Sequence, residues 1–241
     1  MGKEYFIASC VFTSQYPKLS SKIQQYIKER YDIPIVRCCL PNYKLKEFTE
    51  KMPEDYRLNW SSLPDCAEFK PGDTVYSVCH NCLNIIEETK PGVKVASVWE
   101  LILADESFIY PDYCHVKATI QDCWRSNERI SEQKAVRQLL QKMNIDIVEL
   151  PNNYDKTDFC GASLYRPQPL RNPKIAPHHY VEKAQGKFLP HTAEEQKTIM
   201  EEYCKQFSTQ LIVSYCHYCL EGLLLGGVNG KHIAELLFGE R

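Results

Sequence analysis

The sequence predicts an α/β fold of two pseudo-repeated halves, each a small, mostly parallel sheet with flanking helices. Three observations lead to this prediction. Short β-prone runs alternate with helical periodicity from end to end, and four of those runs end on a cysteine. The element Cys-His-x-Cys also occurs twice, from Cys79 to Cys82 and from Cys216 to Cys219. Alternating strands and helices indicate parallel sheets with right-handed crossovers, and the recurring element indicates an internal repeat.

The first half is expected to cover residues 1–112. Ile23 and Ile27 lie on one face of a predicted helix, and Pro91-Gly92 stops another. We therefore expect strands at 5–9, 33–36, 74–78 and 93–98, and helices at 19–30, 82–89 and 99–105.

The second half is expected to cover residues 113–241, after a joint at Tyr110-Pro111-Asp112. Val136, Leu139 and Leu140 have helical spacing, and Thr192 precedes Glu195 as an N-cap residue should. We expect strands at 115–120, 145–150 and 210–215, and helices at 132–143, 192–206, 219–225 and 232–238.

Composition limits the classes of function. The chain of 241 residues has a net charge of −2, so no nucleic-acid partner is expected. It contains no apolar run long enough for a membrane span and no visible signal peptide, which predicts a cytoplasmic protein. In that compartment thiols stay reduced, so its twelve cysteines indicate metal binding or redox chemistry rather than structural disulfides.

Nine of the cysteines form two spaced arrays. The first half has the pattern C-x27-C-C-x39-C-x2-C and the second C-x36-C-G-x54-C-x2-C. Because these cysteines follow strands, we expect each array to gather at the carboxyl ends of its sheet. The candidate metal and cofactor ligands are Cys10, Cys38, Cys39, Cys79, Cys82, Cys123, Cys160, Cys216 and Cys219.

These arrays resemble the cysteine-rich CCG domain family, to which the B subunit of heterodisulfide reductase belongs. The resemblance spans nearly the whole chain and implies a non-cubane [4Fe–4S] cluster on the five cysteines of the first half. Leu40 replaces the motif's glycine there. In the second half Phe159 replaces the first cysteine of the doublet, while Gly161 is kept. The four remaining thiolates leave a cubane [4Fe–4S] cluster, zinc or an empty site as alternatives.

The resemblance also implies an iron–sulfur oxidoreductase subunit of the disulfide reductase type. Its substrate would be a small disulfide or thiol, and its catalytic residue is not assigned. The chain lacks a ferredoxin-type cysteine run and a flavin-binding glycine motif, so electrons would come from a ferredoxin-like or flavoprotein subunit. The alternatives are a non-catalytic interaction subunit stabilised by zinc or a structural cluster, and a cluster-free thiol–disulfide protein.

Two further features have alternative interpretations. His80 and His217 occupy the same slot in the two Cys-x2-Cys elements, where they either donate to cluster sulfur or have no chemical role. Residues 166–191 are rich in proline, lysine and arginine. They form either a lid or docking loop over the cluster end or a packed surface excursion.

Overall fold

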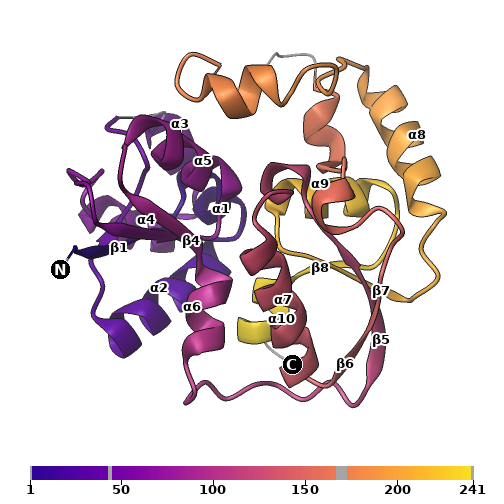
Figure 1. Ribbon diagram of the computed structural model, residues 1–241, viewed down its shortest axis with the longest axis horizontal. Helices are drawn as coiled ribbons and strands as arrows, with labels where there is room; N and C mark the ends of the chain where they lie inside the picture. The colour runs from indigo at the N-terminus through magenta and orange to yellow at the C-terminus, as the bar shows by residue number, and fades with distance from the viewer. Residues whose placement is uncertain (1, 43–44, 167–172, 240–241) are drawn as a thin grey trace. The chain divides into compact units, whose positions relative to one another are not determined.

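The computed structural model describes residues 2–42, 45–166 and 173–239 (Figure 1). Contacts divide the chain into two compact units. Unit 1 comprises Met1–Leu101 with Phe238–Arg241, and unit 2 comprises Ile102–Leu237. The predicted halves 1–112 and 113–241 remain a prediction about the extent of the sequence repeat.

Unit 1 is built on a four-stranded, fully parallel sheet in the order β2-β1-β3-β4. In register, Phe6 of β1 lies between Ile35 and Tyr76 of its two neighbours. The strands are β1 (Glu4–Ile7), β2 (Ile35–Val36), β3 (Thr74–Ser77) and β4 (Lys94–Ser97). The helices are α1 (Cys10–Gln15), α2 (Pro17–Tyr31), α3 (Leu45–Lys51), α4 (Glu54–Ser62), α5 (His80–Thr89) and α6 (Val98–Ala104).

Unit 2 repeats this plan with a parallel sheet in the order β6-β5-β7-β8. The strands are β5 (Val116–Gln121), β6 (Ile145–Val148), β7 (Leu211–Ser214) and β8 (Gly230–His232). The helices are α7 (Ile130–Lys142), α8 (Ala193–Cys204), α9 (His217–Leu225) and α10 (Ile233–Phe238). The last residue of α10, Phe238, is counted with unit 1. Short helical turns are η1 (Trp124–Ser126), η2 (Tyr154–Lys156), η3 (Gly161–Leu164) and the π-turn η4 (His178–Glu182).

The predicted α/β fold with two similar parallel-sheet halves is therefore confirmed. The local signals also act as expected. In α2, Ile23 and Ile27 are buried on one face, and Pro17 is at the start, where its missing N–H costs nothing. In α8, Thr192 and Glu195 form a capping box, with each side chain bonded to the backbone N–H of the other.

Four elements were not predicted, namely α1, α3, α4 and β8. Helix α1 has six residues and β8 three, which is too short for a periodic signal. Helix α4 buries Trp60 while most of its other side chains are exposed, so its pattern is weak. The helix expected at 82–89 begins earlier, at His80, because Cys79 is its N-cap.

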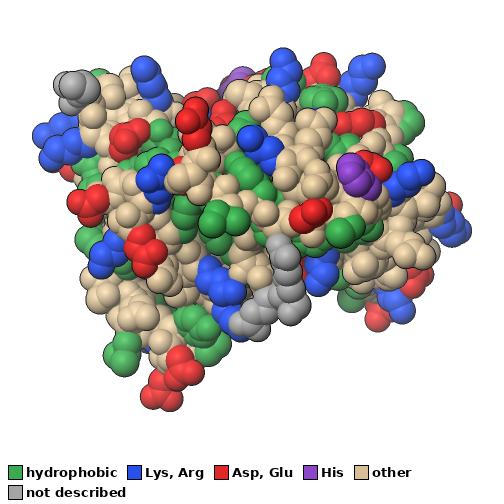
Figure 2. Space-filling model, turned by 90° about the horizontal axis from the view of Figure 1, so that it is seen from below, with side chains coloured by type: hydrophobic (Ala, Val, Ile, Leu, Met, Phe, Trp, Pro, Cys, Tyr) green, Lys and Arg blue, Asp and Glu red, His purple; other side chains and the backbone are tan. Residues whose placement is uncertain are grey.

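The identical strand orders fix where chemistry can occur. In both sheets the first strand along the chain is a central one, with the second strand on one side of it and the third on the other. The connections that leave the two central strands therefore run in opposite directions. That switch point opens a crevice at the carboxyl ends of β1 and β3, and of β5 and β7. None of the described helices is long and apolar enough to cross a membrane. On the face drawn in Figure 2, acidic and basic side chains are interspersed.

Candidate metal centres

In both units the cysteines follow the central strands. Cys10 comes three residues after β1 and Cys79 two after β3, and in unit 2 Cys123 and Cys216 come two residues after β5 and β7. Cys79 and Cys216 are the N-cap residues of α5 and α9, so Cys82 and Cys219 lie in the first turn of each helix. The positive end of a helix dipole favours thiolates at these positions.

The four cysteines of unit 2 form a compact, buried group. The sulfur atoms of Cys123, Cys160, Cys216 and Cys219 all lie within 4.8 Å of one another. The Sγ atoms of Cys123 and Cys160 are 3.5 Å apart. These four cysteines can hold a metal ion or cluster.

The distances between the sulfur atoms indicate which kind of metal centre this group can hold. Four thiolates around one tetrahedral zinc, each about 2.3 Å from it, would stand about 4 Å apart. Around a cubane cluster the thiolates are separated by the whole iron–sulfide core and stand farther apart. The 4.8 Å limit in unit 2 therefore fits a single tetrahedral ion better than a cubane cluster.

The protonation of this group is uneven. Burial raises the pKa of Cys123 and Cys219, and hydrogen bonds among the thiols raise it further. Burial would also raise the pKa of Cys160, but that pKa is lowered, because Cys123 donates a hydrogen bond to it and the charge of Arg125 lies close by. Cys160 therefore ionises before Cys123 and Cys219.

Arg125 is the cation beside the sulfur atoms. Its Nη1 donates to Cys160 Sγ and, over 3.1 Å, to Ser163 Oγ. Three aromatic rings surround the guanidinium, whose carbon lies 5.6 Å from the ring centre of Trp124, 5.1 Å from Tyr218 and 5.9 Å from Phe188. The sequence motif did not point to Arg125, although it lies two residues after a candidate ligand.

A buried polar network holds the strand ends that carry two of the candidate ligands. Asp122 precedes Cys123, and its carboxylate accepts from Arg137 Nη2 at 2.7 Å and from Tyr215 Oη at 2.7 Å. Tyr215 precedes Cys216, so this one hydrogen bond joins the ends of β5 and β7. Arg137 also forms a 2.6 Å ion pair with Glu149, beyond the end of β6. No local pattern marks this network, because its members are far apart along the chain.

In unit 1 the five cysteines are arranged differently. Cys10 and Cys38 have their sulfur atoms 3.9 Å apart. Cys38 is also a neighbour of Cys39, Cys39 of Cys82, and Cys82 of Cys79, each pair close enough for one thiol to shift the pKa of the other. Among the residues that the structure describes, the compact four-sulfur grouping occurs in unit 2 and not here. The five thiols are mutual neighbours without that compact grouping, which fits a centre larger than one ion.

Hydrogen bonding among these thiols selects one thiolate. The Cys10 thiol donates to Cys38 and, with a further bond from Cys39, lowers the pKa of Cys38 to about 3. The same bond raises the pKa of Cys10. Ser9, which precedes Cys10, has a φ of 65°, a conformation that L-residues rarely adopt, and this unusual backbone turns the chain from β1 into α1.

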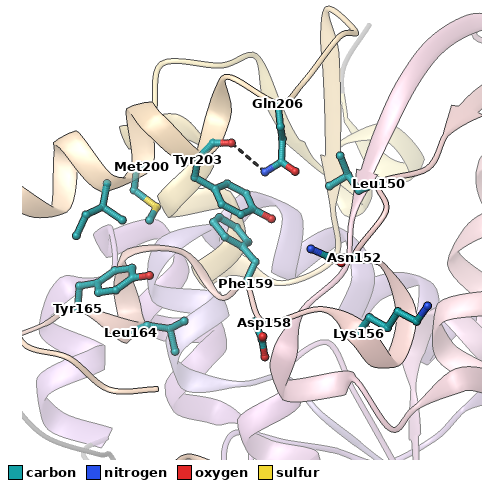
Figure 3. Close-up of a pocket in the computed structure, with 11 residues that line it drawn as sticks. Leu150, Asn152, Lys156, Asp158, Phe159, Leu164, Tyr165, Met200, Tyr203 and Gln206 are labelled. Atoms are coloured by element: carbon teal, nitrogen blue, oxygen red, sulfur yellow. Dashed lines mark hydrogen bonds between the residues drawn. The ribbon is translucent and has the colours of Figure 1, made fainter. Parts of the chain in front are cut away.

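Phe159, which stands at the position of the first cysteine of the doublet, packs its ring against helix α8. The ring stacks on Tyr203 of α8 with centroids 4.2 Å apart, while its carbonyl oxygen lies 3.9 Å from Cys219 Sγ (Figure 3). Both rings line a pocket of about 170 Å³ that also includes Leu164, Tyr165 and Met200. Phe159 thus lines this pocket with its ring and lies beside the candidate ligand Cys219 with its carbonyl group.

Part of the proline-rich segment packs over the cysteine end of unit 2. Its residues 167–172 lie outside the described part of the chain. Beyond them, Phe188 meets Trp124 edge-on at 5.9 Å, and Lys183 and Lys187 pair with Glu128 and Asp158. The described part of this segment therefore covers the turn that follows Cys123.

Two histidines and three further cysteines lie outside the two sets of candidate ligands. His80 and His217 are both buried at the first positions of α5 and α9, and the His217 ring lies 4.2 Å from that of Tyr218. Of the cysteines outside the two arrays, Cys204 is buried, Cys66 half-buried and Cys114 exposed.

No protein-family model and no curated protein matches this chain. Among solved structures, an aspartate racemase homologue from Pyrococcus horikoshii is 14% identical with a TM-score of 0.31, covering 98% of this chain and 96% of its own. A glutamate racemase from Bacillus anthracis is 10% identical with a TM-score of 0.32, covering 98% of this chain and 78% of its own. At these TM-scores the two likenesses indicate neither a family nor a function for this chain.

Proposed function

We propose that this chain is a metalloprotein with two unlike cysteine centres, a single tetrahedral metal ion in unit 2 and an iron–sulfur cluster in unit 1. The observation that carries the proposal is the contrast between the two sets of thiols. Four sulfur atoms in unit 2 lie mutually within 4.8 Å, whereas the five thiols of unit 1 are neighbours without such a compact group among the described residues. A single ion needs the first arrangement, and a larger centre can use the second.

The proposed roles differ accordingly. All four ligands in unit 2 come from the protein and are buried, so the ion there is closed to substrate and stabilises the fold. Zinc is the metal that such a four-thiolate site prefers in proteins. Cys10, Cys38, Cys39, Cys79 and Cys82 would hold the cluster of unit 1.

The proposed activity is reductive cleavage of a small disulfide at unit 1, in line with the resemblance to the CCG domain family. The S–S bond breaks, two electrons enter from a ferredoxin-like or flavoprotein donor, two protons come from solvent, and two thiols leave. A cluster supplies one-electron steps that such donors can feed. The residues of the chain supply burial and thiol hydrogen bonds, which set the potential of the centre.

A non-catalytic interaction subunit is the second candidate, favoured by the closed site in unit 2.

Metal and acid-labile sulfide should be assayed in anaerobically purified protein and in two variants. Cys39→Ser should remove iron and sulfide but leave zinc, and Cys216→Ser should remove zinc but leave iron. Reduction of a small disulfide by a reduced viologen dye should fail only in Cys39→Ser. A protein with zinc alone and no disulfide reduction would support the interaction subunit instead.

A further inference from the structure

Unit 2 differs from unit 1 by one thiol fewer and one cation more. Phe159 stands in the place of the fifth cysteine, and Arg125 stands two residues after Cys123, where unit 1 has the buried Phe12. With every thiol ionised, the cysteine set of unit 2 together with Arg125 is two charge units less negative than the set of unit 1. The missing thiol and the added arginine both make the charge of the unit 2 set less negative.

The placement of Arg125 makes its charge effective. The side chain is buried, and its three neighbouring rings keep water away from the guanidinium. In such surroundings an ionic hydrogen bond is stronger than in water. The rings also favour a cation through their negative faces. Ser163 Oγ accepts from the same Nη1 and donates to the carbonyl of Cys160, so the guanidinium is held on that ligand.

A divalent ion with four thiolates carries a net charge of −2, which is costly to bury without compensation. We propose that Arg125 is the positioning residue of the unit 2 centre, which neutralises part of this charge and, through its hydrogen bond to Cys160, makes that sulfur a weaker electron donor to the metal. This inference rests on the proposed metal site in unit 2. It predicts that the charge of residue 125, and not its shape alone, sets the affinity of the site and the energy of its sulfur-to-metal transitions.

Cobalt(II) is the probe, because it takes tetrahedral thiolate sites and shows sulfur-to-cobalt charge-transfer absorption. Full-length protein is titrated with Co²⁺ against a competing chelator, and the signal missing from Cys216→Ser is assigned to unit 2. Arg125→Met should weaken that binding by about 10–100-fold, as other losses of groups bonded to metal ligands do. Its charge-transfer band should move to lower energy, because sulfur lone pairs without a nearby cation lie higher.

Three further variants separate charge from packing. Arg125→Lys keeps the charge and should restore most of the affinity and the band position. Arg125→Gln keeps a hydrogen-bond donor without the charge and should resemble Arg125→Met. Arg166→Met is the matched control, because Arg166 also lies over the ring of Tyr218, at 5.4 Å, but pairs with Glu221. It should leave the unit 2 signal unchanged.

The outcomes distinguish this inference from the proposal on which it rests. If the unvaried protein has no Co²⁺ signal that depends on Cys216, the proposed unit 2 site is wrong. If it has that signal and Arg125→Gln binds with unchanged affinity and band energy, the site stands and the role of Arg125 is refuted. Should Arg125→Met fail to fold, the comparison of Arg125→Lys with Arg125→Gln decides the question alone.

Discussion

Gly161 and Gly222 are in backbone contact, so that η3 lies directly against α9. A Cβ atom on Gly222 would overlap Gly161 Cα, and one on Gly161 would overlap the carbonyl oxygen of Tyr218. Gly161 also has a φ of 58°, which favours glycine. Because Gly161 follows Cys160 and Gly222 lies one turn after Cys219, this contact brings two of the four candidate ligands together.

Gly161→Ala should therefore destabilise unit 2 and weaken its metal binding. Strain and overlap together should lower the free energy of unfolding by about 2–4 kcal/mol, as measured by urea titration with and without added zinc. Gly186→Ala is the control, because Gly186 has a φ of 75° but no atom within 4 Å of the added Cβ. It should cost about 1 kcal/mol from strain alone. Equal effects of the two variants would show that the contact with α9 is unimportant.

Asp122 should contribute more to the free energy of unfolding than a residue of an exposed ion pair does. Asp122→Ala leaves Arg137 and Tyr215 buried without their shared acceptor, at an expected cost of about 3–5 kcal/mol. Tyr215→Phe removes the hydrogen bond donated to Asp122 and the one accepted from Ser126, and should cost about 1–2 kcal/mol. Lys51→Met, which breaks an exposed pair with Glu47, should cost less than about 0.5 kcal/mol. Urea unfolding at neutral pH measures all three, and an Asp122→Ala variant as stable as Lys51→Met would contradict the account.

Zinc binding at unit 2 should release protons. The raised pKa values of Cys123 and Cys219 keep these thiols protonated at neutral pH, whereas the lowered pKa of Cys160 favours its thiolate. Metal must displace at least the two protons of Cys123 and Cys219. The affinity for zinc should therefore increase about 100-fold for each unit by which the pH is raised, as long as the pH stays below those pKa values. Calorimetry in buffers of different ionisation enthalpy counts the protons. Release of fewer than two would mean that these thiols are already ionised.

The segment from residue 173 to 191 should be held over unit 2 by its ion pairs. Lys183 and Lys187 reach Glu128 and Asp158, and Phe188 packs on Trp124. Replacing both lysines by alanine should speed limited proteolysis within the segment without changing zinc content, since neither lysine is a candidate ligand. A cleavage rate equal to that of a variant with Lys197→Ala, on the exposed face of α8, would show that the pairs do not hold the segment.

The sequence predicts much of the fold, and it does so through local patterns. Strands that end on cysteines, the two Cys-x2-Cys elements and the capping box at Thr192 are all readable from neighbouring residues. Parallel pairing of β5 with β7 then brings Cys123 and Cys216 together without further information. Ligation of metal by the nine cysteines remains a prediction.

What the sequence could not predict depends on contacts between distant residues. Arg125 reaches Cys160 across 35 positions, and Tyr215 reaches Asp122 across 93. No periodicity or motif spacing marks such pairs. The helix α1 was missed because it has only six residues and because a φ of 65° at Ser9 allows it to begin within three residues of a strand.

The central claim, two unlike centres in one chain, is tested most directly by X-ray absorption at the zinc and iron edges of anaerobically purified protein. Zinc should be surrounded by four sulfur atoms at about 2.3 Å with no second metal nearby. At the iron edge we expect sulfur ligands together with an iron–iron distance that disappears in Cys39→Ser. Two iron clusters with no zinc, or zinc in both units, would contradict the account.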